Sequence, residues 1–91
     1  MVVRLEGELD VAVAAQLRAS LVAGVDATAP GGTVTIDLAE VSFIDAAVIG
    51  VLVGVRRRAA SRGVSVHLAN PSARVTTVLE VAGVTRLFEI D

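Results

Sequence analysis

Three short segments of the chain alternate apolar with polar residues, and two longer apolar segments separate them. Residues 2–9, 33–38 and 64–69 show the alternation of strands that bury one face. Residues 11–25 carry apolar residues at four-residue spacing, and residues 45–62 are too long a segment for a strand, so both are predicted to be helices. Strands that alternate with helices predict an α/β domain with a largely parallel sheet and right-handed crossovers.

The polar face of each predicted strand limits how helices can cover the sheet. A parallel sheet with helices on both faces has strands that are apolar throughout. Here every second strand residue is mostly polar or charged, so helices are expected mainly on one face. With 91 residues, the chain is predicted to be a single two-layer α/β domain, residues 1–91. The polar face would consist of Arg4, Glu6, Glu8, Thr33, Thr35, Asp37, Ser65 and His67.

Helix boundaries are predicted from capping residues. Asp10 precedes the first helix and Asp45 precedes the second, and Asp is among the residues preferred at a helix N-cap. Gly63 is expected to end the second helix, after an arginine-rich stretch that suits the negative end of the helix dipole. The first helix would bury the stripe Val13, Leu17, Leu21 and Val25.

The last third of the chain predicts one more helix and one more strand. Asn70 is expected to cap this helix, with Pro71 in its first turn and Gly83 at its end. Residues 87–90 can then form a short fourth strand. The buried stripe of the helix would be Val75, Val78, Leu79 and Ala82.

Composition excludes several classes of chemistry. The chain has no cysteine, a single histidine and no lysine, which excludes thiolate and histidine-rich metal sites and a lysine-containing phosphate loop. No catalytic triad or acid–base pair is evident, so we expect neither an enzyme nor a bound cofactor. The net charge of −2 argues against nucleic acid as the principal partner.

No segment is predicted to insert into a membrane. The longest apolar stretch, residues 41–55, is shorter than the roughly 18–20 residues that span a bilayer, and it contains Asp45. Met1 leads directly into the first predicted strand without the basic region of a secretory signal. We therefore expect a cytoplasmic protein.

The first turn of the second predicted helix has an unusual composition. Asp45 is followed by four apolar residues, 46–49, although the first turn of a helix carries four free N–H donors. An apolar turn at this place indicates either burial against the loop at residues 7–10 or contact with another protein. The residues alone leave both interpretations open.

Three segments of the chain resemble the STAS domain, the fold shared by anti-sigma factor antagonists and the cytoplasmic tails of sulfate transporters. They are VVRLEGELD, VTIDLAEVSFIDAAVIGVLVGV and GVSVHLANPSARVTTVLEVAGVTRLFEI, and the likeness extends over residues 2–91. The resemblance implies a two-layer α/β fold with a mixed, mostly parallel sheet and helices mainly on one face. It also implies a bacterial protein that regulates sigma-factor-dependent transcription.

In antagonists of this family, a hydroxyl in the central turn is phosphorylated by the partner anti-sigma factor, which is a serine kinase. Position by position, Asp45 corresponds to the Asp of that turn, Ala46 to its first Ser and Ala47 to the phosphoacceptor. Because Ala47 has no hydroxyl, the resemblance implies an antagonist that is not phosphorylated at the usual site. The residues implied to bind the partner are Asp10, Asp45, Ala46, Ala47, Val48 and Ile49.

The resemblance leaves two functions open. The first is an antagonist-like protein that binds a kinase-type anti-sigma factor, and the second is an adaptor subunit of a membrane transporter or another complex. The strand that usually precedes residues 2–9 in the family has no counterpart here, so it is either lost or supplied by another chain across an exposed edge. An exposed edge and an apolar turn would also suit a homodimer.

Overall fold

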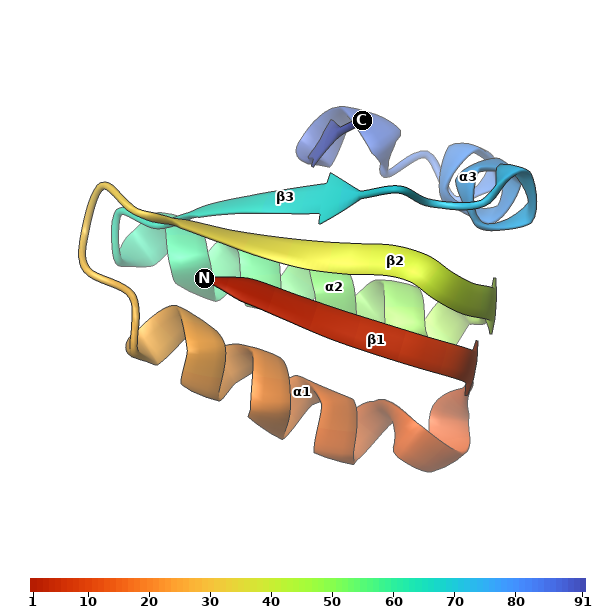
Figure 1. Cartoon of the computed structure of the whole chain (residues 1–91), viewed down its shortest axis with the longest axis horizontal. Coiled ribbons are helices and arrows are strands. Elements are labelled where there is room, and N and C mark those ends of the chain that lie inside the picture. Colours follow the sequence, from red (N-terminus) through yellow and green to blue (C-terminus); the bar gives the residue numbers. More distant parts are fainter.

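The computed structural model describes all residues, 1–91, and confirms the predicted alternation of strands and helices (Figure 1). The elements in chain order are β1 (Val2–Leu9), α1 (Val11–Asp26), β2 (Thr33–Ile44), α2 (Ala46–Ser61), β3 (Ser65–Ala69), α3 (Ala73–Val81), the 3-10 turn η1 (Thr85–Leu87) and β4 (Glu89–Ile90).

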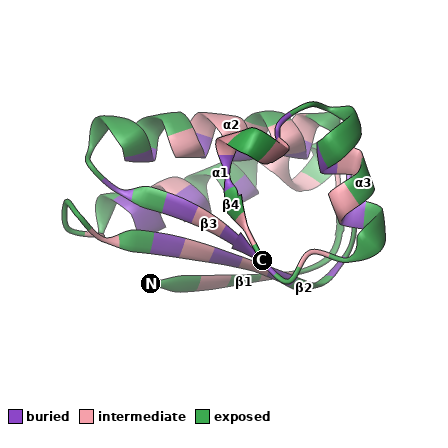
Figure 2. Ribbon diagram, turned by 90° about the horizontal axis from the view of Figure 1, so that it is seen from above, coloured by how far each residue is buried: buried purple, intermediate pink, exposed green.

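The four strands form one sheet in the order β1-β2-β3-β4, and all three pairings are parallel. The sheet is therefore wholly parallel rather than mixed. Each crossover contains a helix, and Figure 2 shows α1 and α2 on the same side of the sheet. The opposite side carries the polar residues of the strands, which confirms the two-layer architecture with helices on one face.

Strand β2 is longer than predicted, because it continues past residue 38 to Ile44. Residues 35–37 pair with both neighbouring strands, whereas residues 40–44 pair with β1 alone. The register of β1 and β2 shifts twice in this region, so the alternation of buried and exposed residues breaks while the strand goes on. The end of β2 leads directly into Asp45 and α2.

The core lies between the helices and the sheet, and no polar or charged residue is buried in it. Three of the four residues predicted to face inward from α1 are fully buried or nearly so, while Val13 is partly exposed. Phe88 is the only buried aromatic residue, so packing rests on Val, Leu, Ile and Ala side chains. This core fixes the positions of the helix ends that carry the site.

The start of α3 differs from the sequence prediction. Ser72, not Asn70, is the N-cap, since its hydroxyl accepts a hydrogen bond from the Val75 N–H at 3.1 Å. Asn70 has a left-handed backbone (φ 56°), and its side-chain amide donates to the Asp37 carboxylate at 3.3 Å. Ala82, predicted to be in the buried stripe, lies past the end of the helix and is exposed.

The last predicted strand is shorter than residues 87–90. Residues 85–87 form the turn η1, and only two residues of β4 pair with β3, opposite His67 and Leu68. The edge of the sheet formed by the first half of β3 therefore has no neighbouring strand.

Candidate functional site

Asp45 binds the N-termini of two helices at once. Its Oδ1 accepts a hydrogen bond from the Val48 N–H at 3.0 Å, which makes it the N-cap of α2 as predicted. Its Oδ2 accepts from the N–H of Val11, the first residue of α1, at 2.9 Å. One carboxylate thus satisfies donors of two helix ends, where the partial positive charges of both helices favour an anion.

The two helix ends are held together by further bonds between β1 and the turn. The Asp45 N–H donates to the Leu9 carbonyl at 3.2 Å, across the end of the β1–β2 pairing. Asp10 is the N-cap of α1, as predicted, and its carboxylate accepts from the Ala12 N–H at 3.0 Å. The turn at residues 45–47 and the loop before α1 therefore form one continuous surface.

The predicted partner-binding residues divide into exposed and buried ones. Ala46 is exposed, and Asp10, Asp45, Ala47 and Ile49 are partly exposed. Val48 is completely buried and belongs to the core, so its side chain anchors the first turn of α2 to the core and is not available to a partner. The apolar first turn is thus explained in part by burial, while its outer side remains open to a partner.

Two exposed apolar side chains beside this turn were not among the predicted site residues. Val11 is 72% exposed, although its N–H is bound to Asp45, and Phe43 is 37% exposed two residues before Asp45. Val11, Phe43, Ala46 and Ala47 are thus exposed or partly exposed apolar residues near Asp45, and we call these four residues the turn patch. The Asp10 and Asp45 carboxylates lie next to it.

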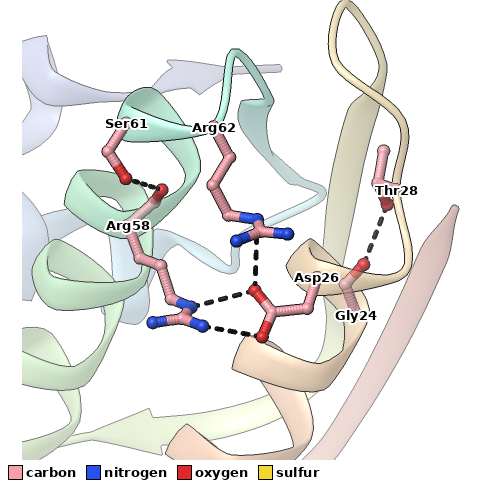
Figure 3. Close-up of polar contacts among 6 residues, drawn as sticks. All are labelled: Gly24, Asp26, Thr28, Arg58, Ser61 and Arg62. Carbon is pink, nitrogen blue, oxygen red and sulfur yellow. Dashed lines mark hydrogen bonds and ion pairs between the residues drawn. The ribbon is translucent and has the colours of Figure 1, made fainter.

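The opposite ends of the same two helices are joined by an ion-pair cluster (Figure 3). Arg58 of α2 donates two hydrogen bonds to the Asp26 carboxylate at the end of α1, at 2.9 and 2.7 Å. Arg62 lies 3.4 Å from the same carboxylate. The hydrogen bonds from Arg58 hold the pKa of Asp26 below its ordinary value of 3.8, and Asp26 in turn raises the pKa of Arg58.

A second carboxylate with a lowered pKa lies on the polar face of the sheet. Asp37 accepts a hydrogen bond from the Ala39 N–H at 3.0 Å, and this bond is the main reason that its pKa lies below 3.8. The Asn70 amide and Arg4, at 3.7 Å, act in the same direction. On the same face, the His67 imidazole contacts the Asp91 carboxylate. Ala39 lies in the part of β2 where the register with β1 shifts. By accepting a hydrogen bond from the Ala39 N–H, Asp37 stabilises the backbone of this irregular segment.

The structure contains no cluster of three His, Cys, Asp or Glu side chains that could hold a metal ion. No helix has both the length and the hydrophobicity needed to cross a bilayer. At the turn patch, exposed apolar residues lie near the Asp10 and Asp45 carboxylates and the N-termini of α1 and α2.

Comparisons with known proteins agree with this architecture. The family described as "Mlab, STAS domain" matches residues 1–89. A search of curated protein sequences found no match. Three solved structures are described here as examples of those that match the fold.

A candidate anti-sigma factor antagonist of Thermotoga maritima superposes with a TM-score of 0.83 at 24% identity, over 98% of this chain and 77% of that one. The Bacillus cell fate determinant SpoIIAA in its phosphorylated form gives 0.69 at 28% identity, over 99% and 80% of the two chains. The STAS domain of a SulP transporter from Vibrio cholerae gives 0.73 at 25% identity, over 98% and 70%.

Proposed function

Because this chain belongs to the STAS domain family, we propose that it acts as an anti-sigma factor antagonist that binds a kinase-type anti-sigma factor through the turn patch. The observation that carries the proposal is the turn itself. Asp45 joins two helix N-termini, and the exposed side chains around it are apolar and lack a hydroxyl at positions 46 and 47. A surface of this kind favours contact with protein over catalysis.

The proposed mechanism differs from a phosphorylation switch in one respect. A phosphate at the start of α2 would add about −1.5 to −2 charges beside the two carboxylates Asp10 and Asp45. Ala47 cannot accept it, so the antagonist would stay competent to bind its anti-sigma factor and release the sigma factor at all times. Binding would take place in the cytoplasm, without a cofactor and without turnover by this chain.

The proposal is tested by a pull-down with purified kinase-type anti-sigma factors in the presence of ATP. We expect the wild-type chain to bind and to remain free of phosphate. The variant A47D should weaken binding at least about tenfold, because it places a charge in an apolar contact. An acidic residue in the first turn of a helix suits the helix dipole, so A47D should fold normally.

The matched control is A29D, which makes the same chemical change in the loop between α1 and β2. This loop lies at the opposite end of the molecule from the turn patch (Figure 1). A29D should bind as the wild type does. Phosphate on Ser42, which is exposed, or on Thr76, which is partly exposed, would contradict constitutive binding. Failure to bind any such partner would contradict the proposal as a whole.

A second candidate function is that of an adaptor subunit of a membrane transporter. The likeness to the STAS domain of a SulP transporter favours it, at 25% identity. In that case the chain should co-purify with a membrane complex. Disruption of the turn patch by A47D should then leave sigma-dependent transcription unchanged.

A further inference from the structure

A surface hollow of about 560 Å³ lies at the end of α2 opposite to the turn patch. It is present because β4 pairs only with His67 and Leu68, which leaves the outer edge of β3 at Ser65 and Val66 without a strand beside it. The wall on one side comes from α2, and on the other from η1 and β4. The lining residues are Arg56, Ala60, Gly63, Val64, Ser65, Val66, Arg86, Leu87, Phe88 and Glu89.

The floor of the hollow is apolar but not sealed. Val64, Val66 and Phe88 are buried, with 4%, 7% and 8% exposure, and all three line the hollow. These three side chains thus belong to the core and also reach the hollow. A hollow of several hundred Å³ whose lining combines apolar side chains with charged and polar ones has the size and the chemistry for a small organic ligand that carries both kinds of group.

Two arginines give the hollow its charge. Arg56 projects from α2 and Arg86 from η1, and both line it without an ion pair to any carboxylate of the chain. The arginines that do form ion pairs are Arg4, Arg58 and Arg62. With one carboxylate in the lining, Glu89, the hollow carries a net charge of +1 (2 − 1), on a chain whose net charge is −2.

The helix dipole does not account for Arg56. Arg58 is the basic residue in the last turn of α2, and Arg56 lies further from the helix end. Arg56 is partly buried as a residue, so part of its side chain packs along the surface of the domain beside the hollow. Guanidinium groups bind carboxylate and phosphate oxygens in a planar, bidentate geometry, so two of them beside an apolar floor select a ligand with an anionic head.

We propose that the hollow between α2, β3 and η1 binds a small amphipathic anion, with its carboxylate or phosphate on Arg56 and Arg86 and its apolar part on Val64, Val66 and Phe88. This site is separate from the turn patch and does not depend on the proposed function. Ser65 also lies in the lining, at the start of β3.

The test is a set of NMR titrations of the ¹⁵N-labelled protein with four probes that separate the effect of an anionic head group from that of an alkyl chain. Octanoate and octyl phosphate carry both, octanol carries only the alkyl chain, and inorganic phosphate carries only the charge. We expect octanoate, octyl phosphate or both to shift the amide signals of Ser65, Val66 and Glu89. Octanol and inorganic phosphate should bind at least about tenfold more weakly. The tighter of the two amphiphiles identifies the head group.

The double variant R56Q/R86Q should weaken binding at least about tenfold, because it removes both charge-assisted contacts. R57Q/R74Q removes the same charge from two exposed arginines outside the hollow and should bind like the wild type. Unchanged signals in the rest of the spectrum verify that both variants are folded. No shift with either amphiphile, equal affinity for octanol, or unchanged affinity of R56Q/R86Q would each overturn the proposal.

Discussion

Asp45 and Asp10 are the two helix caps near the turn patch, and replacing Asp45 should lower the stability of the protein more than replacing Asp10. Asp45 accepts hydrogen bonds from both Val48 and Val11, whereas Asp10 caps α1 alone. Replacement of an N-cap by Ala costs about 0.5–2 kcal/mol, and a hydrogen bond to a charged group contributes about 1.5–3 kcal/mol. We therefore expect D45A to lower the free energy of unfolding by about 2 kcal/mol or more, and D10A by about 1 kcal/mol.

The variant D45N separates the two bonds. Its amide oxygen can still cap α2, but its NH2 group cannot accept from the Val11 N–H, so its stability should lie between wild type and D45A. Urea unfolding followed by circular dichroism measures all three. Equal losses in D45A and D10A would show that the bond to Val11 contributes nothing to stability.

A single hydroxyl group introduced at position 47 should make the binding of the anti-sigma factor sensitive to phosphorylation. In A47S a phosphoacceptor stands in the first turn of α2, where the helix dipole favours a phosphate. With a kinase-type anti-sigma factor that binds the wild type, we expect A47S to gain phosphate and then to lose affinity for the kinase. Mass spectrometry of the ATP-treated chains detects the phosphate. A46S, with the hydroxyl one position earlier, should stay unmodified, and phosphate on A46S instead would show that the correspondence of positions is wrong.

At the level of elements, α1 and α2 are joined at both ends, by Asp45 at their N-termini and by Asp26 at their C-termini. The lowered pKa of Asp26 gives the second contact a pH dependence. The contribution of this ion pair is fully present above the ordinary pKa of Asp26 in the unfolded chain, 3.8, and is lost as the pH falls through its lower pKa in the folded chain. D26N should therefore be less stable than wild type at pH 7, and the difference should shrink below about pH 4.

The pH series needs a reference variant whose loss does not involve a carboxylate. L52A serves as this reference, because the stability that it loses comes from the apolar core and should be the same at pH 7 and at pH 3. R58Q removes the other partner of Asp26 and should follow the pH trend of D26N. A difference between D26N and wild type that stays constant from pH 7 to pH 3 would contradict the role of the ion pair.

The elements that the sequence predicts well are those whose pattern is regular. Strands with clean alternation and helices with an Asp cap were predicted correctly, apart from their exact ends. The second half of β2 was missed because β2 advances three residues, Asp37 to Glu40, while β1 advances two, Arg4 to Glu6. This irregularity breaks the alternation on which the prediction depends. At the start of α3, Asn70 and Ser72 are both residue types that cap helices well. An N-cap residue has an extended backbone, which Ser72 has and Asn70, with its left-handed backbone, does not.

For the whole molecule, the site could be predicted only as far as local sequence determines it. Asp45 and Asp10 were predicted as helix caps because each precedes a helix pattern, and the structure confirms both caps. The bond from Val11 to Asp45 joins residues 34 positions apart, and it exists because the parallel pairing of β1 and β2 brings their ends together. Val11 became part of the turn patch for the same reason, whereas Phe43 lies only two residues before Asp45 in the sequence. The hollow beside β3 depends on the shortness of β4, which residues 87–90 do not reveal by their alternation.

The small aliphatic core makes the stability of the whole domain sensitive to a single cavity. Leu52 of α2 is 1% exposed in the core, and replacement of a buried Leu by Ala costs about 2–5 kcal/mol. Domains of this size have a total stability of about 5–15 kcal/mol, so L52A should remove a large part of it and shift the urea midpoint strongly. Val81 of α3 is 84% exposed, and V81A should change stability by less than about 0.5 kcal/mol. If the two variants lost stability equally, the burial of Leu52 between helix and sheet would be wrong, and with it the packing that holds α2 and the turn patch in place.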